Sequence, residues 1–361
     1  MVRLGDICKF QSGGTPSKGE PSYFNGNLPW ITTVALNGSI IDESCAVDWI
    51  TEKAIENSAA KVVPANSVMV GTRVGVGKVA INKVPMSTSQ DIISLLDIDE
   101  SKWSKEFICK FILGQATYLN SQARGATIKG IKIETLAGLQ LPDIPLDQQC
   151  KIAVSIDAVN NLIALRKEQL AKLDQLVKSR FIELFGDYRI NEKGFDCKKG
   201  SELFKFSSGK FLPEEKRLDE GIPVYGGNGI AWYTSESLVD YPTIIIGRVG
   251  AQCGNIHAVT TPVWITDNAI YIKEQKTNAY TLEFLTELMR MMDFYQYADF
   301  SGQPKITQKP LETLNYIMPP IELQNEYTAF VEQTDKSKVS IQQSLDKLEL
   351  LKKSLMQEYF G

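Results

Sequence analysis

The amino-acid sequence predicts an α+β fold in which two β-rich domains alternate with two long helices that pair as an antiparallel coiled coil. The first observation is a repeat: residues 145–186 and 320–361 align at a constant shift of 175 positions, and eleven of the 42 aligned positions are identical. The second is an apolar heptad pattern in both copies. The third is that each copy follows a stretch of short β-like runs. Because an internal repeat constrains the architecture more than any local motif, we expect two half-molecules with pseudo-two-fold symmetry.

The repeat also predicts where the domains begin and end. The first β-rich domain is expected over residues 1–144, the first long helix over 145–186, the second domain over 187–319 and the second helix over 320–361. Within the domains, β-branched runs such as 68–70 and 243–246 predict strands, since Gly, Pro, Asn and Ser clusters separate them. Shorter helices are expected at 104–121 and 281–297.

The heptad pattern predicts which side chains of the long helices face each other. In the first copy, eight of ten positions at alternating three- and four-residue spacing are apolar, which is typical of a coiled-coil seam. The second copy follows the same spacing with polar interruptions at Thr334, Lys338 and Lys352. The predicted seam contains Ile156, Ile163, Leu170, Leu173, Val177, Ile341, Leu345, Leu348 and Leu355. The alternative is two independent amphipathic helices, each packed on its own domain.

The ends of the two long helices carry boundary signals. Pro145 and Pro320 stand where a first turn begins, and Gly186 and Gly361 stand where a helix C-cap is expected. About 38 helical residues at 1.5 Å each form a rod of roughly 57 Å. A rod of this length can set a fixed separation between two globular modules.

Composition indicates a water-soluble globular protein. Of its 361 residues 43% are hydrophobic and 23% are charged, and no apolar run approaches the roughly 20 residues of a membrane span. The N-terminus lacks the apolar stretch of a signal peptide, so we expect a cytoplasmic protein without membrane contact. The six cysteines are at least 37 residues apart, which favours reduced structural thiols. The net charge is −4 and the pI about 5.4, so any nucleic-acid partner would require positive surface from another subunit.

The sequence carries few residues typical of catalysis. One histidine, His257, excludes a multi-histidine metal site, and the segment 71–79 lacks the spacing of a phosphate-binding P-loop. The Pro-Pro pair at 319–320 lacks the flanking residues of an adenine methyltransferase motif. We therefore expect a non-catalytic chain with no metal site and no bound cofactor.

Polar stretches at comparable places in the two halves are candidate nucleic-acid contacts. Arg73-Val74-Gly75 aligns with Arg248-Val249-Gly250, and residues 89–93 align with 266–270 after two inserted residues. Arg, Lys, Gln, Asn, Ser and Thr are the residue types that read base edges or bind phosphates. The candidates are Thr15, Arg73, Lys78, Ser89, Gln90, Arg124, Thr127 and Lys129 in the first half, and Tyr225, Gly227, Asn228, Arg248, Gln252, Asn268, Ser301, Gln303 and Lys305 in the second. The alternative for each is an ordinary solvated loop.

With these features in view, the whole chain resembles the specificity subunit of a type I DNA restriction–modification system. The long helices that open with residues 145–149 and 320–324 and end in Phe-Gly resemble the family's helical regions. Residues 2–7, 28–32 and 222–229 resemble stretches of its target-recognition domains.

The resemblance implies a function and partners. Each domain would read one half of a split double-stranded DNA target, and the helix pair would fix the spacer. Two methyltransferase subunits would dock against the helices, joined in the full complex by two restriction subunits. S-adenosylmethionine, ATP and Mg²⁺ would be bound by these partners, which would methylate adenine after flipping the base out of the duplex.

Two other functions are compatible with parts of the sequence. A coiled-coil scaffold joining two protein-binding domains, without DNA sequence readout, would suit the acidic composition. A self-contained nuclease or methylase would require motifs that the sequence lacks.

Overall fold

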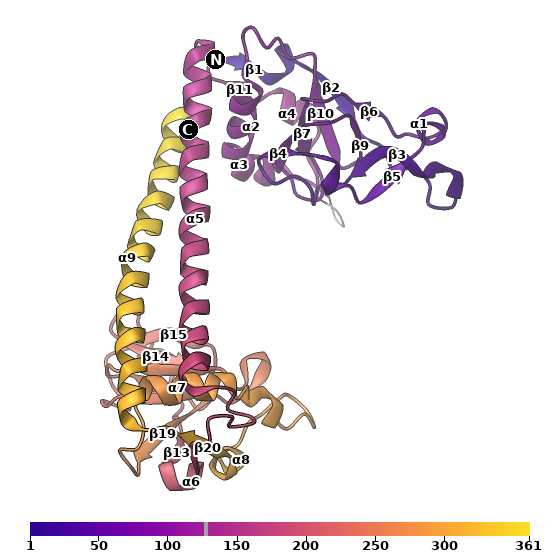
Figure 1. Ribbon diagram of the computed structural model, residues 1–361. Helices are drawn as coiled ribbons and strands as arrows, with labels where there is room; N and C mark the ends of the chain where they lie inside the picture. Colours follow the sequence, from indigo (N-terminus) through magenta and orange to yellow (C-terminus); the bar gives the residue numbers. More distant parts are fainter. Residues whose placement is uncertain (126–128) are drawn as a thin grey trace. The chain divides into compact units, whose positions relative to one another are not determined.

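The computed structural model describes residues 1–125 and 129–361, and the chain divides into two compact units. The first unit contains residues 1–166 and 344–361, and the second contains residues 167–343. Two long helices each contribute one end to each unit: α5, Leu146–Phe185, and α9, Ile321–Phe360 (Figure 1). The predicted α+β fold with two β-rich domains and two long helices is confirmed.

The first unit is built from two packed sheets and a β-ribbon. Its main sheet has the strand order β2-β10-β7-β8-β4, antiparallel except at β4, and its second sheet has the order β5-β3-β9-β6. The ribbon pairs β1 with β11. The bounds are β1 Val2–Arg3, β2 Lys9–Ser12, β3 Phe24–Ile31, β4 Ile40–Ile41, β5 Asp48–Ile50, β6 Val62–Val63, β7 Val68–Gly71, β8 Val79–Asn82, β9 Met86–Thr88, β10 Ile92–Leu96 and β11 Gln140–Leu141.

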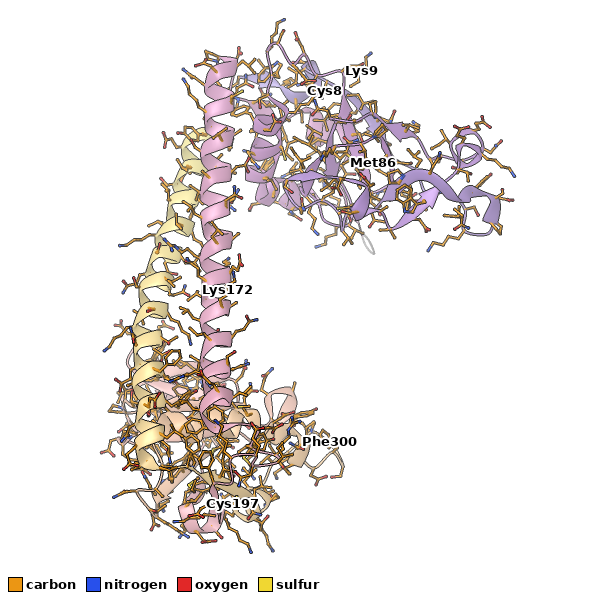
Figure 2. All side chains as sticks on the ribbon, viewed as in Figure 1. Cys8, Lys9, Met86, Lys172, Cys197 and Phe300 are labelled. Atoms are coloured by element: carbon orange, nitrogen blue, oxygen red, sulfur yellow. The ribbon has the colours of Figure 1, made fainter. Side chains whose placement is uncertain are left out.

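Alternation along the strands explains how the main sheet of the first unit is buried on both faces. Val68 and Val70 of β7 pack with the helical layer, whereas Met69 between them packs with the second sheet. Because strand side chains alternate between the two faces, a run that is buried on both sides is apolar throughout. Met86 of β9 completes the layer between the sheets (Figure 2).

Helix α2 covers one face of the main sheet of the first unit, whereas α1 packs against η2 and β3. The bounds of the helical elements are η1 Leu4–Asp6, η2 Pro21–Tyr23, η3 Glu43–Cys45, α1 Glu52–Asn57, α2 Lys105–Gly114, α3 Ala116–Gln122 and α4 Ile133–Ala137. The predicted single helix over 104–121 is wrong, because the chain turns at Gln115 between α2 and α3. The turn brings Gly114 against α9, where an added Cβ would lie 2.9 Å from Met356 Cε and 3.4 Å from Phe360 Cδ2.

The second unit repeats the sheet plan of the first. Its main sheet has the order β13-β19-β16-β17, its second sheet has the order β15-β14-β18, and a ribbon pairs β12 with β20. In both units one inner strand of the second sheet, β3 in the first and β14 in the second, pairs antiparallel on one side and parallel on the other. The strand bounds are β12 Asp196–Lys199, β13 Phe204–Ser208, β14 Ile222–Gly226, β15 Gly229–Thr234, β16 Thr243–Gly247, β17 Ile256–Val259, β18 Trp264–Ile265, β19 Ala269–Gln275 and β20 Asn315–Met318.

One helix covers the main sheet of the second unit as α2 does in the first. This helix, α7, spans Leu282–Met291 and packs with Ile244 and Ile246 of β16, while Ile245 faces the second sheet. The predicted helix over 281–297 is interrupted, because Asp293 adopts a left-handed conformation with φ 46° that an α-helix cannot continue through. The remaining helical elements are α6 Gly200–Leu203, η4 Glu214–Lys216, η5 Gly250–Gln252, η6 Phe294–Tyr297 and α8 Gln308–Thr313.

The predicted seam residues lie on the shielded face of both long helices. Ile156, Val177 and Leu345 are buried, and the other six predicted positions are half-buried. Thr334 is also buried and Lys338 is half-buried, whereas Lys352 is exposed. Within the second unit the helices run antiparallel, since Arg180 pairs with Glu326 and Asp174 pairs with Lys338 at 2.8 Å.

A buried glutamine fastens the start of each long helix to the domain that precedes it. The Gln149 side chain accepts the Ser104 N–H at 2.9 Å and donates to the carbonyls of Lys102 and Ile144 at 2.9 Å. At the equivalent position of the repeat, Gln324 accepts the Thr281 N–H at 2.9 Å. It donates to the carbonyls of Ala279 and Pro319 at 2.9 and 2.8 Å.

A phenylalanine fastens the end of each long helix to the other domain's covering helix. In the first unit, Phe360 of α9 lies 5.3 Å from the Phe107 ring and 5.8 Å from the Phe111 ring of α2. In the second unit, Phe185 of α5 lies 4.8 Å from the Phe284 ring of α7. Each unit is therefore closed by the start of one long helix and the end of the other.

We expect Phe360→Ala to destabilise the first unit by about 3 kcal/mol, because it leaves a cavity between two buried rings. Amide hydrogen exchange should accelerate over α2 and stay unchanged over α7. Leu350→Ala is the control, since this side chain is 68% exposed and its loss should change stability by about 0.5 kcal/mol or less. Equal acceleration in α2 and α7 would show that Phe360 does not anchor the first unit specifically.

Candidate nucleic-acid interface

Three segments of the first unit meet at one edge of its main sheet. They are the loop 72–78 between β7 and β8, the loop 89–91 before β10, and the segment that contains residues 129–132 before α4. The Thr72 N–H donates to the Asp91 carbonyl at 2.8 Å, and the Ile131 N–H donates to the Thr72 carbonyl at 2.8 Å. Arg124 and Gly130 exchange backbone hydrogen bonds of 2.9 and 3.0 Å. The backbone of Thr72 therefore links all three segments, and we call this hydrogen-bonded arrangement the three-loop frame.

These segments enclose a cleft of about 590 Å³. It is lined by Arg73, Gln90, Asp91, Gln122, Arg124, Gly130, Ile131, Lys132 and Thr135. Three of the predicted residues, Arg73, Gln90 and Arg124, are thus brought together, and all three are exposed. The sequence did not single out Asp91 or Lys132, because only the hydrogen bonds between distant loops place them here.

The other candidates of the first half lie apart from this lining. Thr15 and Lys78 are exposed on loops, and Lys129 is exposed beside the cleft. Ser89 is buried, and its hydroxyl has no hydrogen-bond partner among the described residues. Thr127 lies outside the described residues.

The second unit contains the same hydrogen-bonded frame. The Arg248 N–H donates to the Asn268 carbonyl at 2.9 Å, and the Ile306 N–H donates to the Arg248 carbonyl at 2.8 Å. Asp299 and Lys305 exchange backbone hydrogen bonds of 2.8 and 3.1 Å, as Arg124 and Gly130 do in the first unit. Three loops of the second domain are therefore joined through the backbone of Arg248.

This frame shows that the predicted alignment of the two Arg-Val-Gly triplets is wrong by one residue. The N–H of Gly71 donates to the Lys78 carbonyl at 2.8 Å, and that of Gly247 donates to the Asn255 carbonyl at 2.8 Å. Gly247 is therefore the counterpart of Gly71, and Arg248 is the counterpart of Thr72 rather than of Arg73. The second loop also carries one extra residue, because Gly247 and Asn255 stand eight positions apart whereas Gly71 and Lys78 stand seven apart.

The remaining candidates of the second half surround this frame. Arg248 is half-buried and its Nη1 donates to the Asp267 carbonyl at 3.3 Å. Tyr225, Gly227 and Asn228 lie at the β14–β15 turn. Exposed side chains complete the set at Gln252, Asn268, Ser301, Gln303 and Lys305.

In each unit a tryptophan donates to an equivalent backbone carbonyl, although the two tryptophans stand on different strands. In the first unit, Trp30 Nε1 of β3 donates to the Gly14 carbonyl at 3.0 Å. In the second, Trp264 Nε1 of β18 donates to the Lys210 carbonyl at 3.0 Å. These carbonyls correspond, because the preceding residues Gly13 and Gly209 donate to the start of β10 and β19 at 3.0 Å. The indole therefore stands on one strand of the parallel pair in the first unit and on the other strand in the second, but it makes the same hydrogen bond.

The second unit also carries exposed aromatic side chains beside its three-loop frame, which the sequence analysis did not predict. Phe300 is 54% exposed and its ring lies 5.2 Å from that of Tyr295 (Figure 2). Elsewhere in the second unit, the guanidinium carbon of Arg217 lies 4.1 Å from the centre of the half-buried Trp232 ring. Apolar rings on a water-facing loop beside Ser301 could have been suspected from the Asp-Phe-Ser-Gly sequence at 299–302.

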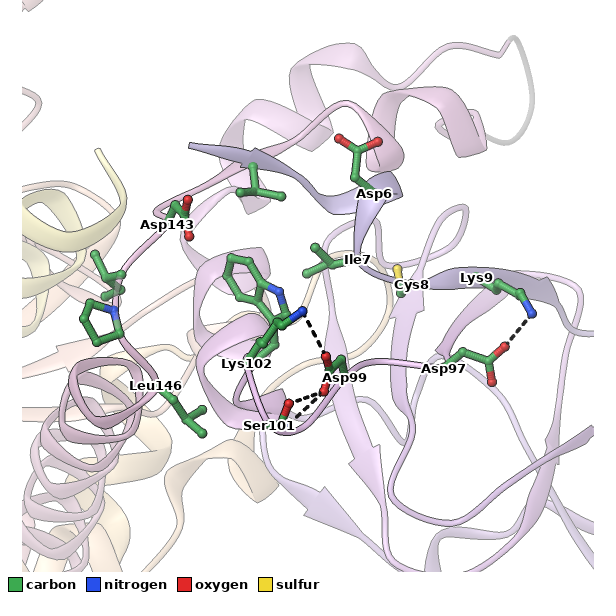
Figure 3. Close-up of a pocket in the computed structure, with 14 residues that line it drawn as sticks. Asp6, Ile7, Cys8, Lys9, Asp97, Asp99, Ser101, Lys102, Asp143 and Leu146 are labelled. Atoms are coloured by element: carbon green, nitrogen blue, oxygen red, sulfur yellow. Dashed lines mark hydrogen bonds and ion pairs between the residues drawn. The ribbon is translucent and has the colours of Figure 1, made fainter.

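A larger cleft of about 950 Å³ in the first unit has a different character (Figure 3). Its carboxylates Asp97 and Asp99 pair with Lys9 at 2.8 Å and Lys102 at 3.5 Å. Burial raises the pKa of the Cys8 thiol in its wall to about 12, so this thiol remains protonated at neutral pH. The cleft is lined by none of the predicted contact residues.

The described residues offer little for metal or membrane chemistry. No group of three or more His, Cys, Asp or Glu side chains within residues 1–125 and 129–361 could hold a metal ion. Burial lowers the pKa of His257, so this imidazole is neutral at pH 7. Over the same residues, no helix combines the length and the apolar composition that a membrane crossing needs.

Comparison with known proteins agrees with the two-unit plan. The specificity subunit of the type I restriction enzyme EcoprrI from Escherichia coli is 24% identical over 356 residues, which cover 92% of this chain and 86% of the relative. The MjaIX specificity subunit of Methanocaldococcus jannaschii is 26% identical over 240 residues, which cover 62% of this chain and 56% of the relative.

Solved structures share the fold over the whole chain. A crystal structure of the type I restriction–modification S subunit from M. genitalium superposes with a TM-score of 0.67 at 18% identity, covering 100% of this chain and 95% of that one. A chain from a study of complex assembly and conformational transition of the type I restriction–modification system gives a TM-score of 0.62 at 16% identity, covering 99% and 96%.

The family model for the type I restriction modification DNA specificity domain matches residues 1–175 and again residues 192–350. The two matches coincide with the two copies of the three-loop frame and with most of both long helices. Since they span more than half of the sequence, the chain belongs to the family of type I restriction–modification DNA specificity proteins.

Proposed function

We propose that this chain is the target-recognition subunit of a DNA methylation and restriction complex, with each unit reading one half of a bipartite DNA site. The observation that carries the proposal is the three-loop frame, which is built twice with the same backbone hydrogen bonds and different exposed side chains. A shared backbone with divergent polar groups suits two domains that read different base sequences. If the two domains were only structural supports, this divergence of the exposed polar side chains would have no function.

The acidic composition supports partner subunits that contribute to DNA binding. A protein that binds DNA alone usually carries a basic surplus, whereas this chain has a net charge of −4. We assign the missing positive surface to methyltransferase subunits, two of them in our proposal, with two restriction subunits in the complete complex. S-adenosylmethionine, ATP and Mg²⁺ would bind to those partners, and this chain would act without catalysis or a cofactor of its own.

The first part of α5 carries a surface that suits such a partner. Val154, Leu162 and Leu165 are 69%, 44% and 54% exposed. With 3.6 residues per turn they share one face of the helix, and the shielded residues Ile156 and Ile163 occupy another. An apolar stripe on a water-facing helix marks a site of protein association. We assign it to a methyltransferase subunit.

A scaffold function without DNA readout is not favoured. It accounts for the long helices, but it leaves unexplained why Arg73, Gln90 and Arg124 converge from three separate loops.

Exchanging the stripe for charge should break the complex. We expect Leu162→Asp combined with Leu165→Asp to weaken methyltransferase binding at least about 10-fold, because two apolar contacts become desolvated carboxylates. Size-exclusion chromatography of the coexpressed subunits measures this, and circular dichroism checks folding. Glu168→Ala, an exposed change on the same helix, should leave the complex intact. Unchanged assembly of the double variant would place the docking surface elsewhere.

Arg248→Ala should alter base preference in one half of the target only. Loss of this side chain removes a donor from the second frame, so we expect about a 10-fold loss of selectivity at one position. Binding selection from randomised duplexes with the intact complex reads both halves at once. Arg189→Ala serves as control, because Arg189 pairs with Asp187 and lies in neither frame. Equal weakening across all sequences would instead identify Arg248 as a phosphate contact.

Shortening the helix pair should affect the spacer and leave the half-site sequences unchanged. The deletion removes Leu170–Leu176 from α5 together with 334–340 of α9, which the Asp174–Lys338 ion pair places opposite. Seven residues correspond to about 10 Å of helix, or roughly three base pairs of DNA. Sequencing of methylated sites should reveal a changed spacer or no methylation. New half-site sequences with the original spacer would refute the ruler role.

A further inference from the structure

We infer that the cleft of the first unit reads a G·C base pair, with Arg73 and Arg124 donating to guanine and Asp91 accepting from cytosine. The inference rests on the proposed function and adds the identity of the bases that this cleft selects. It follows from the charges gathered around one cleft of about 590 Å³.

The two arginines are available to a ligand. Both are exposed, and neither guanidinium forms an ion pair with any residue in the described ranges. Their backbones are held in place, since Arg124 is hydrogen-bonded to Gly130 and Arg73 follows the Thr72 junction. The stem of Arg73 packs on Gly130, where an added Cβ would lie 2.9 Å from Arg73 Cγ. Guanine offers two major-groove acceptors, O6 and N7, so each of the two guanidinium groups can donate to one of them.

The carboxylate of Asp91 distinguishes a base edge from a phosphate. It lines the same cleft, and among the described residues its side chain has no ion-pair partner. An anion at this position repels a phosphate group. A G·C pair, by contrast, offers two acceptors on guanine and the N4 amino donor on cytosine. Two cationic donors beside one anionic acceptor therefore match a G·C pair better than the DNA backbone.

The second unit carries a different set at the equivalent positions. In the first unit these positions hold three cations, Arg73, Arg124 and Lys132, and one anion, Asp91. The hydrogen-bonded frame places Val249, Asp299, Thr307 and Asn268 at the corresponding positions. Three further positions of the frame, Thr72, Gln90 and Gly130 in the first unit, correspond to Arg248, Asp267 and Lys305 in the second. Together, the seven positions of the second unit therefore carry two cations and two anions. The guanine-reading pair is thus a property of the first unit.

The test separates base reading from charge by replacing arginine with lysine. Arg73→Lys and Arg124→Lys keep the positive charge but replace a planar, directed N–H donor by a rotating ammonium group on a flexible stem. Binding selection with the intact complex should show at least a 10-fold weaker preference for G·C at one position of the first half-site. The salt dependence of binding should stay unchanged, because the charge is retained. A retained preference in both variants would overturn the inference.

A modified base provides a second measurement that does not depend on protein folding. Replacing the guanine of that position by 7-deazaguanine removes the N7 acceptor, so wild-type binding should weaken about 10-fold. The same replacement elsewhere in the spacer should have no effect. The matched protein control is Arg217→Lys, because Arg217 stacks on Trp232 in the second unit and should not change the first half-site.

The outcomes also separate this inference from the proposed function. If the wild-type complex selects no sequence at all, the proposed function fails. If it selects a bipartite sequence whose first half contains no G·C-specific position, only the present inference fails. The half read by the second unit is recognised by its response to Arg248→Ala.

Discussion

The buried amides of Gln149 and Gln324 are the contacts on which the rest of the structure depends. Each side chain satisfies one backbone N–H and two carbonyls at the point where a domain gives way to a long helix. A buried donor or acceptor without a partner costs about 1–3 kcal/mol, so three satisfied groups strongly favour one helix direction. Because the accepted N–H belongs to Ser104 or Thr281, the N-caps of α2 and α7, the same amide also fixes the covering helix.

The opposite ends of the long helices complete what the glutamines begin. Phe360 and Phe185 pack on α2 and α7, so each domain holds the start of the helix that follows it and the end of the other helix. An aromatic ring can occupy such a place in either unit because its stabilisation comes from burial and ring contacts, which need no particular polar partner. This explains how the first unit is completed by a phenylalanine that lies more than 200 positions after α2 in the sequence.

The sequence predicted the long helices well but only part of the lining of the first unit's cleft, for physical reasons. A helix leaves a local sequence pattern, because its apolar side chains recur every three or four residues and proline and glycine mark its ends. The frame around Thr72 and Arg248 depends on backbone hydrogen bonds between distant loops, which leave no local pattern. This is why the Arg-Val-Gly triplets aligned with a one-residue error, and why Asp91 and Lys132 were not identified.

Under the proposed function, the same distinction would let one fold serve many DNA targets. Backbone hydrogen bonds and an indole on the Gly14 or Lys210 carbonyl hold the loops of the frame, and the indole is supplied by a different strand in each unit. The side chains that face solvent around the frame contribute little to folding, since exposed substitutions usually change stability by about 0.5 kcal/mol or less. Arg124 in one unit and Asp299 in the other can therefore occupy the same place at similar stability. Base preference can thus change by substitution at the frame while the fold and the helix anchors stay as they are.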